Sequence, residues 1–361
     1  MRNKARVIAF YLPQFHPIEE NNRWWGEGFT EWTNVGKARQ LYRGHYQPRV
    51  PADLGYYDLR VAETRNAQAE MARKYGIEGF CYWHYWFGDG KRLLERPFKE
   101  VLQSGEPDFP FCLAWANESW RGFFHGLKSA ESLIEQRYLG VEDYTQHFYD
   151  VLDAFKDERY ITVDGKPLFM VYKPMEHPEM KLFIDTWRKL AIENGLKGIY
   201  FVAHSYFLKE QRLELEEMGF DAINVVRLFD YKTRSRGLYR KSRWRHKWLK
   251  QPYVVSYKKA SQLFVKKDED SAHDVFPTVI PNWDHSPRSL TNGLVLDGST
   301  PELFANHLRD ALDCLEGREE DKRILFVKSW NEWGEGNYLE PDLKFGRRYL
   351  EELAKQIVSH E

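Results

Sequence analysis

The chain has few cysteines, no excess of charge of either sign and no long apolar run. Its three cysteines, Cys81, Cys112 and Cys314, follow no metal-ligand spacing and cannot all pair, which argues against a disulfide framework or a zinc ribbon. Lys and Arg number 53 against 54 Asp and Glu, so the average surface attracts neither nucleic acid nor anionic membrane. No stretch reaches the roughly 20 apolar residues of a membrane span, and the first residues lack the core of a secretory signal. A cytoplasmic protein is expected.

Several catalytic motifs are also missing. No GlyXaaSerXaaGly elbow follows an apolar run, no HisGluXaaXaaHis pair is present, and no glycine-rich loop could cradle a phosphate. We therefore expect no metal and no cofactor. Aromatic residues, in contrast, make up 16% of the 361 residues and include 13 Trp and 21 Tyr. Flat amphipathic rings are typical of pockets for neutral polar ligands, so sugars are the favoured ligand class.

Eight short apolar runs, each followed by a segment of helical character, recur along the whole chain. Their continuous rather than alternating hydrophobicity predicts strands covered on both faces, and hence a parallel sheet. The runs are Arg6–Tyr11, Gly79–Trp86, Phe109–Ala116, Leu168–Tyr172, Ile199–Ala203, Ala222–Val226, Phe276–Pro281 and Ile324–Trp330. Eight such units predict an α/β protein with a (β/α)8 TIM barrel. A doubly wound open sheet is the competing interpretation, although its dinucleotide fingerprint is absent after the first run.

No Pro/Gly/Ser linker, low-complexity tract or internal repeat divides the sequence. We therefore expect a single domain over residues 1–361, with long loops after the strands. About 45 residues separate the first strand from the next helix. Loops of that length in a compact domain are usually functional, and in a barrel they stand at the C-terminal rim, where active sites are built.

Polar and aromatic residues gather in the long first loop and at the ends of strands one, two, three, five, seven and eight. A single His or Trp at a strand end is usually structural, but a ring of them around one axis indicates a pocket for a polyhydroxylated ligand. The predicted substrate-binding residues are Tyr11, Gln14, His16, Trp24, Trp25, Glu31, Trp32, His45, Tyr46, Gln47, Tyr82, His84, Tyr85, Trp86, Trp115, Asn117, Glu118, His204, Trp283, Asp284, Arg288, Trp330, Asn331 and Trp333.

Two carboxylates, Glu332 and Glu335, leave the last strand three positions apart. In an extended strand this spacing would put them on opposite faces, roughly 10 Å apart along the chain. A turn at Gly334 and Gly336 would instead bring them to about 5–6 Å. Close carboxyls beside tryptophan rings would repel each other and lose solvent, so one pKa should rise while the other group stays ionised. The pair is therefore predicted to be catalytic, against the alternative of a solvated surface turn.

A basic segment, Lys232–Lys250, stands out from the neutral average. It holds nine of the 53 Lys and Arg residues and no acid, which leaves 44 basic against 54 acidic residues elsewhere. The segment falls in a basic insertion at about residues 230–252, in the loop after strand six. It is either a solvated helix or a docking site for an anionic group, such as a lipid pyrophosphate or an anionic membrane surface at the inner membrane face. Nucleic acid is not expected, because the remainder is acidic.

Seven stretches carry a resemblance to a known family. They are Ala9–Pro17, Trp24–Val35, Gly44–Arg49, Phe80–Phe87, Leu113–Glu118, Asn282–Arg288 and Trp330–Pro341. Together they resemble the WbsX-like proteins, a family described as glycosyltransferases of bacterial surface-polysaccharide clusters. The wider resemblance is to glycoside hydrolase family 99, the endo-α-mannosidases, which are (β/α)8 barrels. The resemblance implies an α-linked, mannose-like glycan of a surface polysaccharide as the substrate, and the basic segment adds a lipid-pyrophosphate-linked glycan as an alternative form.

The resemblance also implies roles for the carboxylate pair. Glu332 would take the proton from the substrate 2-hydroxyl, so that O2 attacks the anomeric carbon and forms a 1,2-anhydro sugar. Glu335 would protonate the leaving oxygen and then activate water or a sugar hydroxyl. Two positions depart from the family: Gly334 replaces a usual His and is expected to widen the site beside the acid, and His285 replaces a usual Asn. Hydrolysis and transfer both stay open, and so does a non-catalytic glycan-binding or assembly protein.

Overall fold

The computed structural model describes residues 3–122 and 132–358, and its centre is a closed barrel of eight parallel strands. The barrel strands are β1 (Arg6–Tyr11), β2 (Gly79–His84), β3 (Phe111–Trp115), β7 (Lys166–Val171), β8 (Tyr200–Ser205), β9 (Ala222–Val225), β11 (Val275–Val279) and β13 (Ile324–Val327). They neighbour one another in the order β3-β2-β1-β13-β11-β9-β8-β7, and β3 pairs with β7 to close the cylinder. The (β/α)8 prediction is thus confirmed, and the open doubly wound sheet is wrong.

The strands form where the sequence is apolar on both sides of the pleat. Every residue of β2, β3, β8, β9, β11 and β13 is buried. Inside the cylinder, Phe10 stacks on Trp83 with ring centroids 4.9 Å apart and on Phe326 at 5.3 Å. Outside it, helices cover the strands. Such double coverage explains why the strand sequences are continuously hydrophobic.

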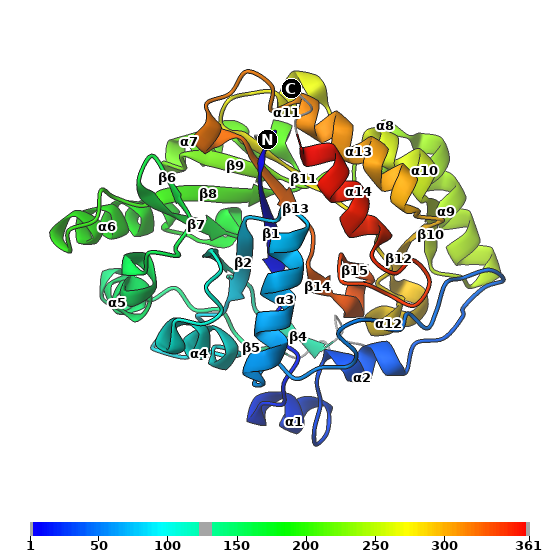
Figure 1. The fold of residues 1–361 in the computed structure, drawn as a ribbon, viewed down its shortest axis with the longest axis horizontal. Coiled ribbons are helices and arrows are strands. Elements are labelled where there is room, and N and C mark those ends of the chain that lie inside the picture. The colour runs from blue at the N-terminus through cyan, green and yellow to red at the C-terminus, as the bar shows by residue number, and fades with distance from the viewer. Residues whose placement is uncertain (1–2, 123–131, 359–361) are drawn as a thin grey trace.

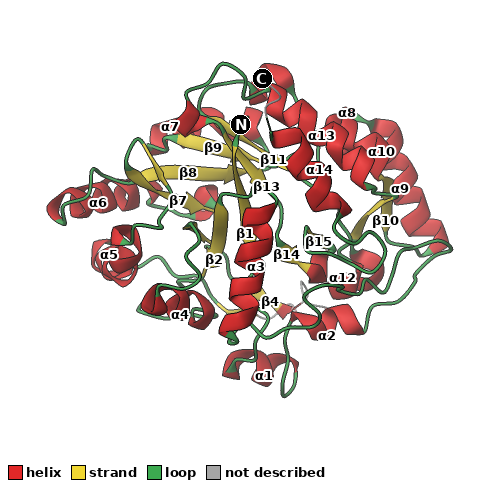
Figure 2. Cartoon of the chain, in the orientation of Figure 1, coloured by secondary structure: helices red, strands yellow, loops and turns green. Residues whose placement is uncertain are grey.

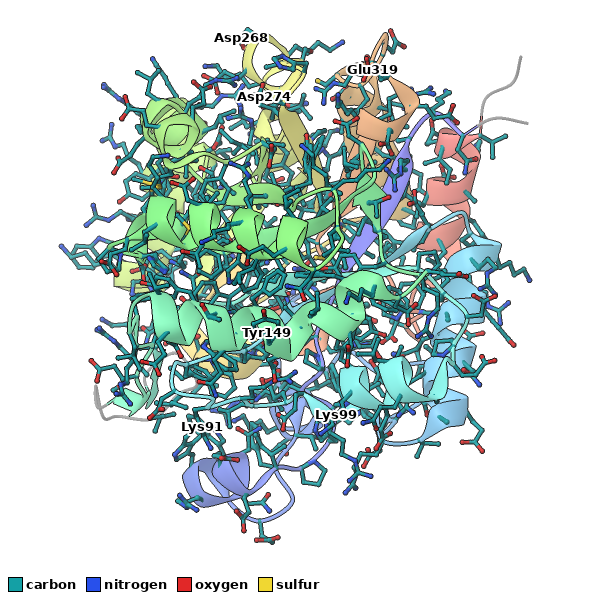
Figure 3. All side chains as sticks on the ribbon, turned by 90° about the vertical axis from the view of Figure 1, so that its left-hand side faces the viewer. Lys91, Lys99, Tyr149, Asp268, Asp274 and Glu319 are labelled. Carbon is teal, nitrogen blue, oxygen red and sulfur yellow. The ribbon has the colours of Figure 1, made fainter. Side chains whose placement is uncertain are left out.

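Helices form the outer layer around the barrel (Figures 1 and 2). The layer consists of α3 (Ala62–Lys74), α4 (Arg96–Ser104), α5 (Val141–Lys156), α6 (Met180–Glu193), α7 (Leu208–Met218), α13 (Pro301–Asp313) and α14 (Arg348–Ile357). Figure 3 views the molecule from the side of α4, α5 and α6, with Lys99 and Tyr149 on the outer surface. Among the described residues, no helix has the length and apolar character needed to cross a bilayer.

Shorter elements build the end of the barrel at which the strands terminate. They are α1 (Glu19–Trp25), α2 (Glu31–Gly36), β4 (Trp120–Arg121), β5 (Ser132–Ile134), α12 (Ser286–Ser289), β14 (Asn331–Glu332), η6 (Trp333–Glu335) and β15 (Asn337–Tyr338). In Figure 1 these elements lie toward the lower part of the molecule, where β1 ends. The remaining short pieces are β6 (Thr162–Val163), which pairs antiparallel with the start of β7, and the turns η2 (Pro174–Glu176) and η5 (Glu320–Lys322).

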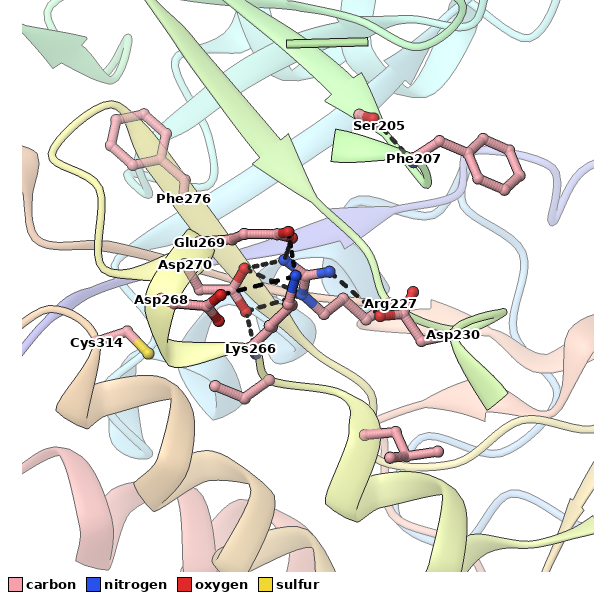
Figure 4. A network of polar contacts seen from close by, with 12 residues as sticks. Ser205, Phe207, Arg227, Asp230, Lys266, Asp268, Glu269, Asp270, Phe276 and Cys314 are labelled. Atoms are coloured by element: carbon pink, nitrogen blue, oxygen red, sulfur yellow. Dashed lines mark hydrogen bonds and ion pairs between the residues drawn. The ribbon is translucent and has the colours of Figure 1, made fainter. Parts of the chain in front are cut away.

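The connection between β9 and β11 is a long one that spans residues 226–274. It carries α8 (Tyr231–Arg234), α9 (Arg236–Leu249), β10 (Tyr253–Ser256), α10 (Tyr257–Ala260), η3 (Ser261–Leu263) and α11 (Lys267–Asp270). Its strand β10 pairs with β12 (Leu294–Asp297), which follows α12 and η4 (Leu290–Asn292). Near its base, the buried Arg227 guanidinium donates to Asp270 at 2.9–3.0 Å and to Glu269 at 2.8 Å (Figure 4). The two ends of the connection are thereby tied together.

Candidate active site

The sequence after β13 folds back as a small hairpin. Asn331 and Glu332 in β14 pair antiparallel with Asn337 and Tyr338 in β15, and η6 forms the turn between them. The turn closes at Gly336, whose φ of 55° favours glycine and where a Cβ would lie 2.7 Å from that of Asp284. The Asn331 side chain anchors the hairpin to the end of β1 by accepting from Leu12 N at 2.7 Å and donating to Leu12 O at 3.0 Å. This hairpin holds both carboxylates at the barrel mouth.

Glu332 and Glu335 line the same cavity, which has a volume of about 430 Å³. All eight barrel strands or the loops directly after them contribute to its wall. The lining residues are Leu12, Gln14, Trp83, Tyr85, Ala116, Glu118, Ser119, Trp120, Arg121, Tyr172, Lys173, Tyr206, Phe207, Phe229, Trp283, His285, Arg288, Lys328, Glu332 and Glu335. The cavity therefore sits at the C-terminal mouth of the barrel, and its size and mixed aromatic and charged wall suit a sugar unit.

The Glu332 carboxylate is buried and has two close partners from its own segment. Ser329 Oγ donates to Glu332 Oε2 at 2.8 Å, and Lys328 Nζ lies 3.9 Å from the same oxygen. Burial raises the pKa of Glu332 and the charge of Glu335 raises it further, while Lys328, Arg288 and the Ser329 hydroxyl act against that rise. Glu332 is therefore the carboxyl of the pair that holds a proton more readily.

Glu335 has the opposite electrostatic setting. Arg288 Nη1 donates to Glu335 Oε1 at 2.5 Å, and His285 Nε2 lies 3.5 Å from that oxygen. Burial alone would raise the pKa of Glu335, but Arg288 and His285 outweigh it, so the pKa lies well below its usual range. The two carboxyls of the hairpin are thus driven apart in protonation, with Glu335 as the ionised member.

Arg288 also bridges the hairpin to α2, since its Nε donates to Glu31 Oε2 at 3.1 Å. The Glu31 carboxylate is fully buried and lies against Gly334, where a Cβ would overlap the carboxylate and lie 3.0 Å from Arg288 Nε. The expectation that Gly334 widens the site is therefore wrong. The space that a side chain would take at position 334 is filled by the Glu31–Arg288 ion pair.

Lys328 is a buried cation in the cavity wall that the sequence pattern did not reveal as a site residue. Its side chain is 4% exposed, and its ammonium lies 5.5 Å from the Trp83 ring centroid, 5.7 Å from that of Trp283 and 5.8 Å from that of Phe10. Burial would lower its pKa, but Tyr206, Glu332 and Glu335 raise it above the usual value. The surroundings of Lys328 therefore favour the charged ammonium beside Glu332.

A third carboxyl, Glu118, lies on the wall formed after β3. Burial raises its pKa, and Lys173 Nζ at 3.9 Å opposes that rise. Asn117 fixes the neighbouring backbone, because its side chain accepts from Lys173 N at 2.7 Å and donates to Lys173 O at 2.9 Å. This wall adds a carboxyl and an ammonium that can meet sugar hydroxyls.

Behind Glu335, a buried polar cluster supports the hairpin. His45 Nε2 lies 2.7 Å from Asp284 Oδ2, and Gln47 Nε2 donates to the same oxygen at 2.8 Å. The backbone of Asp284 donates to the Glu335 carbonyl at 2.6 Å. Burial opposes ionisation of Asp284, but His45 and Arg49 outweigh it and lower its pKa. His45, Gln47 and Arg49 of the first loop thus support the hairpin through Asp284, and none of these side chains lines the cavity.

Of the residues predicted from sequence, Gln14, Tyr85, Glu118, Trp283, Arg288, Glu332 and Glu335 line the cavity. The others lie around it. Trp86 and Trp115 pack on His147 of α5, and Trp333 stacks on Tyr338 at 3.7 Å behind the hairpin. The remaining predicted residues that contact other parts of the fold are Tyr11, His16, Trp24, Trp25, Trp32, Tyr46, Tyr82, His84, His204 and Trp330.

The strand alternation could have identified two of the missed residues. Side chains two apart share a face, so Trp83 and Tyr85 point into the mouth while Tyr82, His84 and Trp86 point toward the helices. Lys328 follows Phe326 by two positions and shares its inward face. In contrast, Phe207 and Phe229 reach the cavity from loops and Trp120 from the two-residue strand β4, and no periodicity marks these three residues. No cluster of three His, Cys, Asp or Glu side chains with metal-binding geometry occurs in residues 3–122 and 132–358.

The fold is shared with carbohydrate-active enzymes of known structure. The glycoside hydrolase family 99 endo-alpha-mannosidase from Bacteroides thetaiotaomicron superimposes with a TM-score of 0.61 at 15% identity, covering 99% of this chain and 97% of that one. A protein titled glycoside hydrolase-like protein superimposes with a TM-score of 0.60 at 12% identity, covering 99% and 95%. At such identities the likeness shows the fold, a (β/α)8 barrel of the type found in these enzymes.

Sequence comparison gives the family. Residues 7–353 match the family Glycosyltransferase WbsX, and the chain belongs to that family. Two curated relatives named uncharacterized protein WxcX, from two strains of Xanthomonas campestris pv. campestris, are each 34% identical over 355 residues. The match covers 98% of this chain and 50% of each relative, so the chain spans about half the length of the curated relatives it matches. The family is described as glycosyltransferases, and the fold is a (β/α)8 barrel.

Proposed function

We propose that this protein cleaves or transfers at an α-glycosidic, mannose-like bond of a bacterial surface polysaccharide or its lipid-pyrophosphate-linked precursor. The observation that carries the proposal is the pair Glu332 and Glu335 on one aromatic cavity at the C-terminal mouth of the barrel. The mannose preference rests on the likeness to the endo-alpha-mannosidase fold. The polysaccharide context rests on membership of the WbsX family.

In the proposed first step, Glu332 accepts the proton of the substrate 2-hydroxyl. Atom O2 attacks the anomeric carbon, the bond to the leaving oxygen breaks, and Glu335 gives that oxygen a proton. In the second step, Glu335 takes a proton from water or an acceptor hydroxyl, whose oxygen attacks the anomeric carbon. The bond from that carbon to O2 breaks, and Glu332 returns its proton to O2. Water gives hydrolysis and a sugar hydroxyl gives transfer.

The electrostatics of the site favour part of this scheme and oppose part of it. The raised pKa of Glu332, together with its contacts to Ser329 and Lys328, suits a base that must be strong and still ionise. The ionised state of Glu335 suits its second step. Its first step requires a proton on a carboxyl that Arg288 holds in the charged form. Bound substrate would have to weaken the Glu335–Arg288 ion pair before Glu335 could act as the acid. The acid role of Glu335 and the base role of Glu332 are therefore tested separately.

Leaving-group dependence distinguishes the two roles. Glu332→Gln and Glu335→Gln would be compared on a native α-mannosyl disaccharide and on an aryl α-mannoside whose leaving group needs no proton. If Glu335 is the acid, Glu335→Gln loses about 10²–10⁴-fold on the disaccharide and much less on the aryl substrate. Glu332→Gln loses the same factor on both. If Glu332→Gln is the variant that loses less activity on the aryl substrate, Glu332 is the acid and Glu335 is the base.

Product analysis tests the function itself. The wild type would be incubated with defined mannosides and with the polysaccharide intermediate, and mass spectrometry would detect both cleavage and transfer products. Bound glycan without turnover would support the non-catalytic binding or assembly protein instead. The proposal treats the chain as one carbohydrate-active domain, because the barrel strands span from Arg6 to Val327. It places the reaction in the cytoplasm, which fits three buried cysteines that form no disulfide.

A further inference from the structure

The helix α9 exposes an unusual combination of side chains. Arg236, Arg240, Arg243 and Lys247 are spaced by four, three and four residues, which puts them on one stripe of the helix. Trp244 and Trp248 follow two of these cations by one position and form the adjacent stripe. Their side chains are 54% and 65% exposed. We call these six residues, together with Lys241, the α9 face.

The opposite side of α9 is fixed to the protein. Ser242 is fully buried, and the His246 ring stacks on Tyr253 of β10 with centroids 4.1 Å apart. The connection that carries the helix is tied at its base by Arg227 and the carboxylates of Glu269 and Asp270 (Figure 4). Helix α9 also lies at the right-hand edge of the molecule in Figure 1. The α9 face is therefore presented outward on a firm support.

The cations of the α9 face differ from their neighbour Arg234 in their ion pairing. Arg234, just before the helix, pairs with Asp230 at 3.3 Å. Within the described part of the chain, none of the five cations of the face forms an ion pair with a carboxylate. Outside the basic segment the protein has 44 basic and 54 acidic residues, so the positive charge is concentrated on this helix. Such a local concentration of positive charge attracts anions from outside the protein.

We propose that the α9 face docks the protein onto an anionic lipid bilayer. Lys and Arg near such a surface are attracted by its negative potential, and exposed Trp rings lie favourably at the level of the headgroups. A hollow of about 620 Å³ beside the face is lined by Arg240, Arg243 and Lys247 together with Tyr253 and Thr291, and it offers room for a phosphate headgroup. The contact is lateral, along a helix that does not span the membrane.

The bilayer is favoured over a nucleic acid by two observations. The exposed apolar groups Trp244, Trp248 and Leu249, the last 49% exposed, cluster beside the cations, as in helices that lie at a membrane surface. The rest of the protein is acidic and would repel an extended polyanion. The proposal goes beyond the proposed reaction, because it involves neither Glu332 nor Glu335 and holds whichever reaction the barrel performs.

Vesicle co-sedimentation tests the proposal. The probes are phosphatidylcholine vesicles with and without phosphatidylglycerol, and the wild type should bind only the anionic ones, less as salt rises. Each cation near the surface contributes about fivefold. The variant carrying Arg240→Gln, Lys241→Gln, Arg243→Gln and Lys247→Gln should therefore bind at least 100-fold more weakly. A matched control removes four exposed lysines on other helices, Lys99, Lys156, Lys209 and Lys258, and should bind as the wild type does.

A second variant tests the apolar part. Trp244→Ser with Trp248→Ser keeps every charge, and we expect binding to fall at least tenfold and to become more sensitive to salt. Circular dichroism and thermal unfolding would show that each variant folds. Three results would overturn the proposal: a wild type that ignores anionic vesicles, equal losses in the charge variant and its control, or stronger binding to duplex DNA than to the vesicles.

Discussion

Replacement of Lys328 by Met offers a sharp test of how the site controls protonation. Met keeps the length and apolar stem of lysine and removes only the charge. In the native site the ammonium lies 3.9 Å from Glu332 Oε2 and opposes the rise in the pKa of that carboxyl. Without it, the pKa of Glu332 rises further. A base is active only when ionised, so the acidic limb of the pH profile of kcat/KM should move to higher pH.

The size of this effect follows from the geometry. Two unit charges 3.9 Å apart attract by about 4 kcal/mol at an effective dielectric constant of about 20. Screening by solvent is weak, because the side chains of Lys328 and Glu332 are 4% and 9% exposed. Even if water and polar groups rearrange around the Met side chain so that only a third of this attraction is lost, the protonation equilibrium of Glu332 changes about tenfold. The limb should therefore move by at least about one pH unit.

A suitable control removes a lysine that lines the same cavity but is not among the groups that face Glu332. Those groups are Lys328, Glu335, Arg288, Tyr85, Tyr206 and the Ser329 hydroxyl. Lys173 also lines the cavity, but its ammonium lies beside Glu118. In an assay of kcat/KM from pH 4 to 9, Lys173→Met should leave the limb in place while Lys328→Met moves it. An unmoved limb in Lys328→Met, with activity that still depends on Glu332, would refute this electrostatic reasoning.

Other substitutions give further expectations. Gly334→Ala should lower the free energy of unfolding by about 1–3 kcal/mol in a denaturant titration, because the new Cβ displaces the Glu31 carboxylate, whereas Gly237→Ala, with open space around it, should not destabilise. Arg288→Gln should cost about 3–5 kcal/mol in the same titration, since it leaves a buried carboxylate without its cation. Trp283→Ala should raise KM about threefold to tenfold through lost ring contact with the sugar, with a smaller change in kcat measured by steady-state kinetics.

The barrel was predictable from sequence because its physical cause is local. Strand β1 has the predicted bounds Arg6–Tyr11, and each of the other seven apolar runs contains or overlaps a barrel strand. A strand buried on both faces needs an unbroken apolar run, and such runs are visible without any knowledge of contacts. The prediction that the sheet closes into a barrel came from the count of eight strand–helix units.

The detailed site was less predictable because it depends on direction and on distant partners. Trp86 and Trp115 stand at strand ends as Tyr85 does, yet their rings point away from the cavity toward α5. The Glu31–Arg288 pair joins residues 257 positions apart. No local pattern reports such a contact. The role of Gly334 was misjudged for this reason, since the group that fills its space comes from α2.

The central claim is that the two carboxylates of the hairpin perform the chemistry on a glycan bound in the cavity. The most direct measurement compares Glu332→Gln and Glu335→Gln with the wild type on one glycan, with turnover by mass spectrometry and binding by calorimetry. The account predicts that turnover of that glycan falls about 10²–10⁴-fold in each variant, while its dissociation constant changes much less. Turnover within threefold of the wild type in either variant would contradict it.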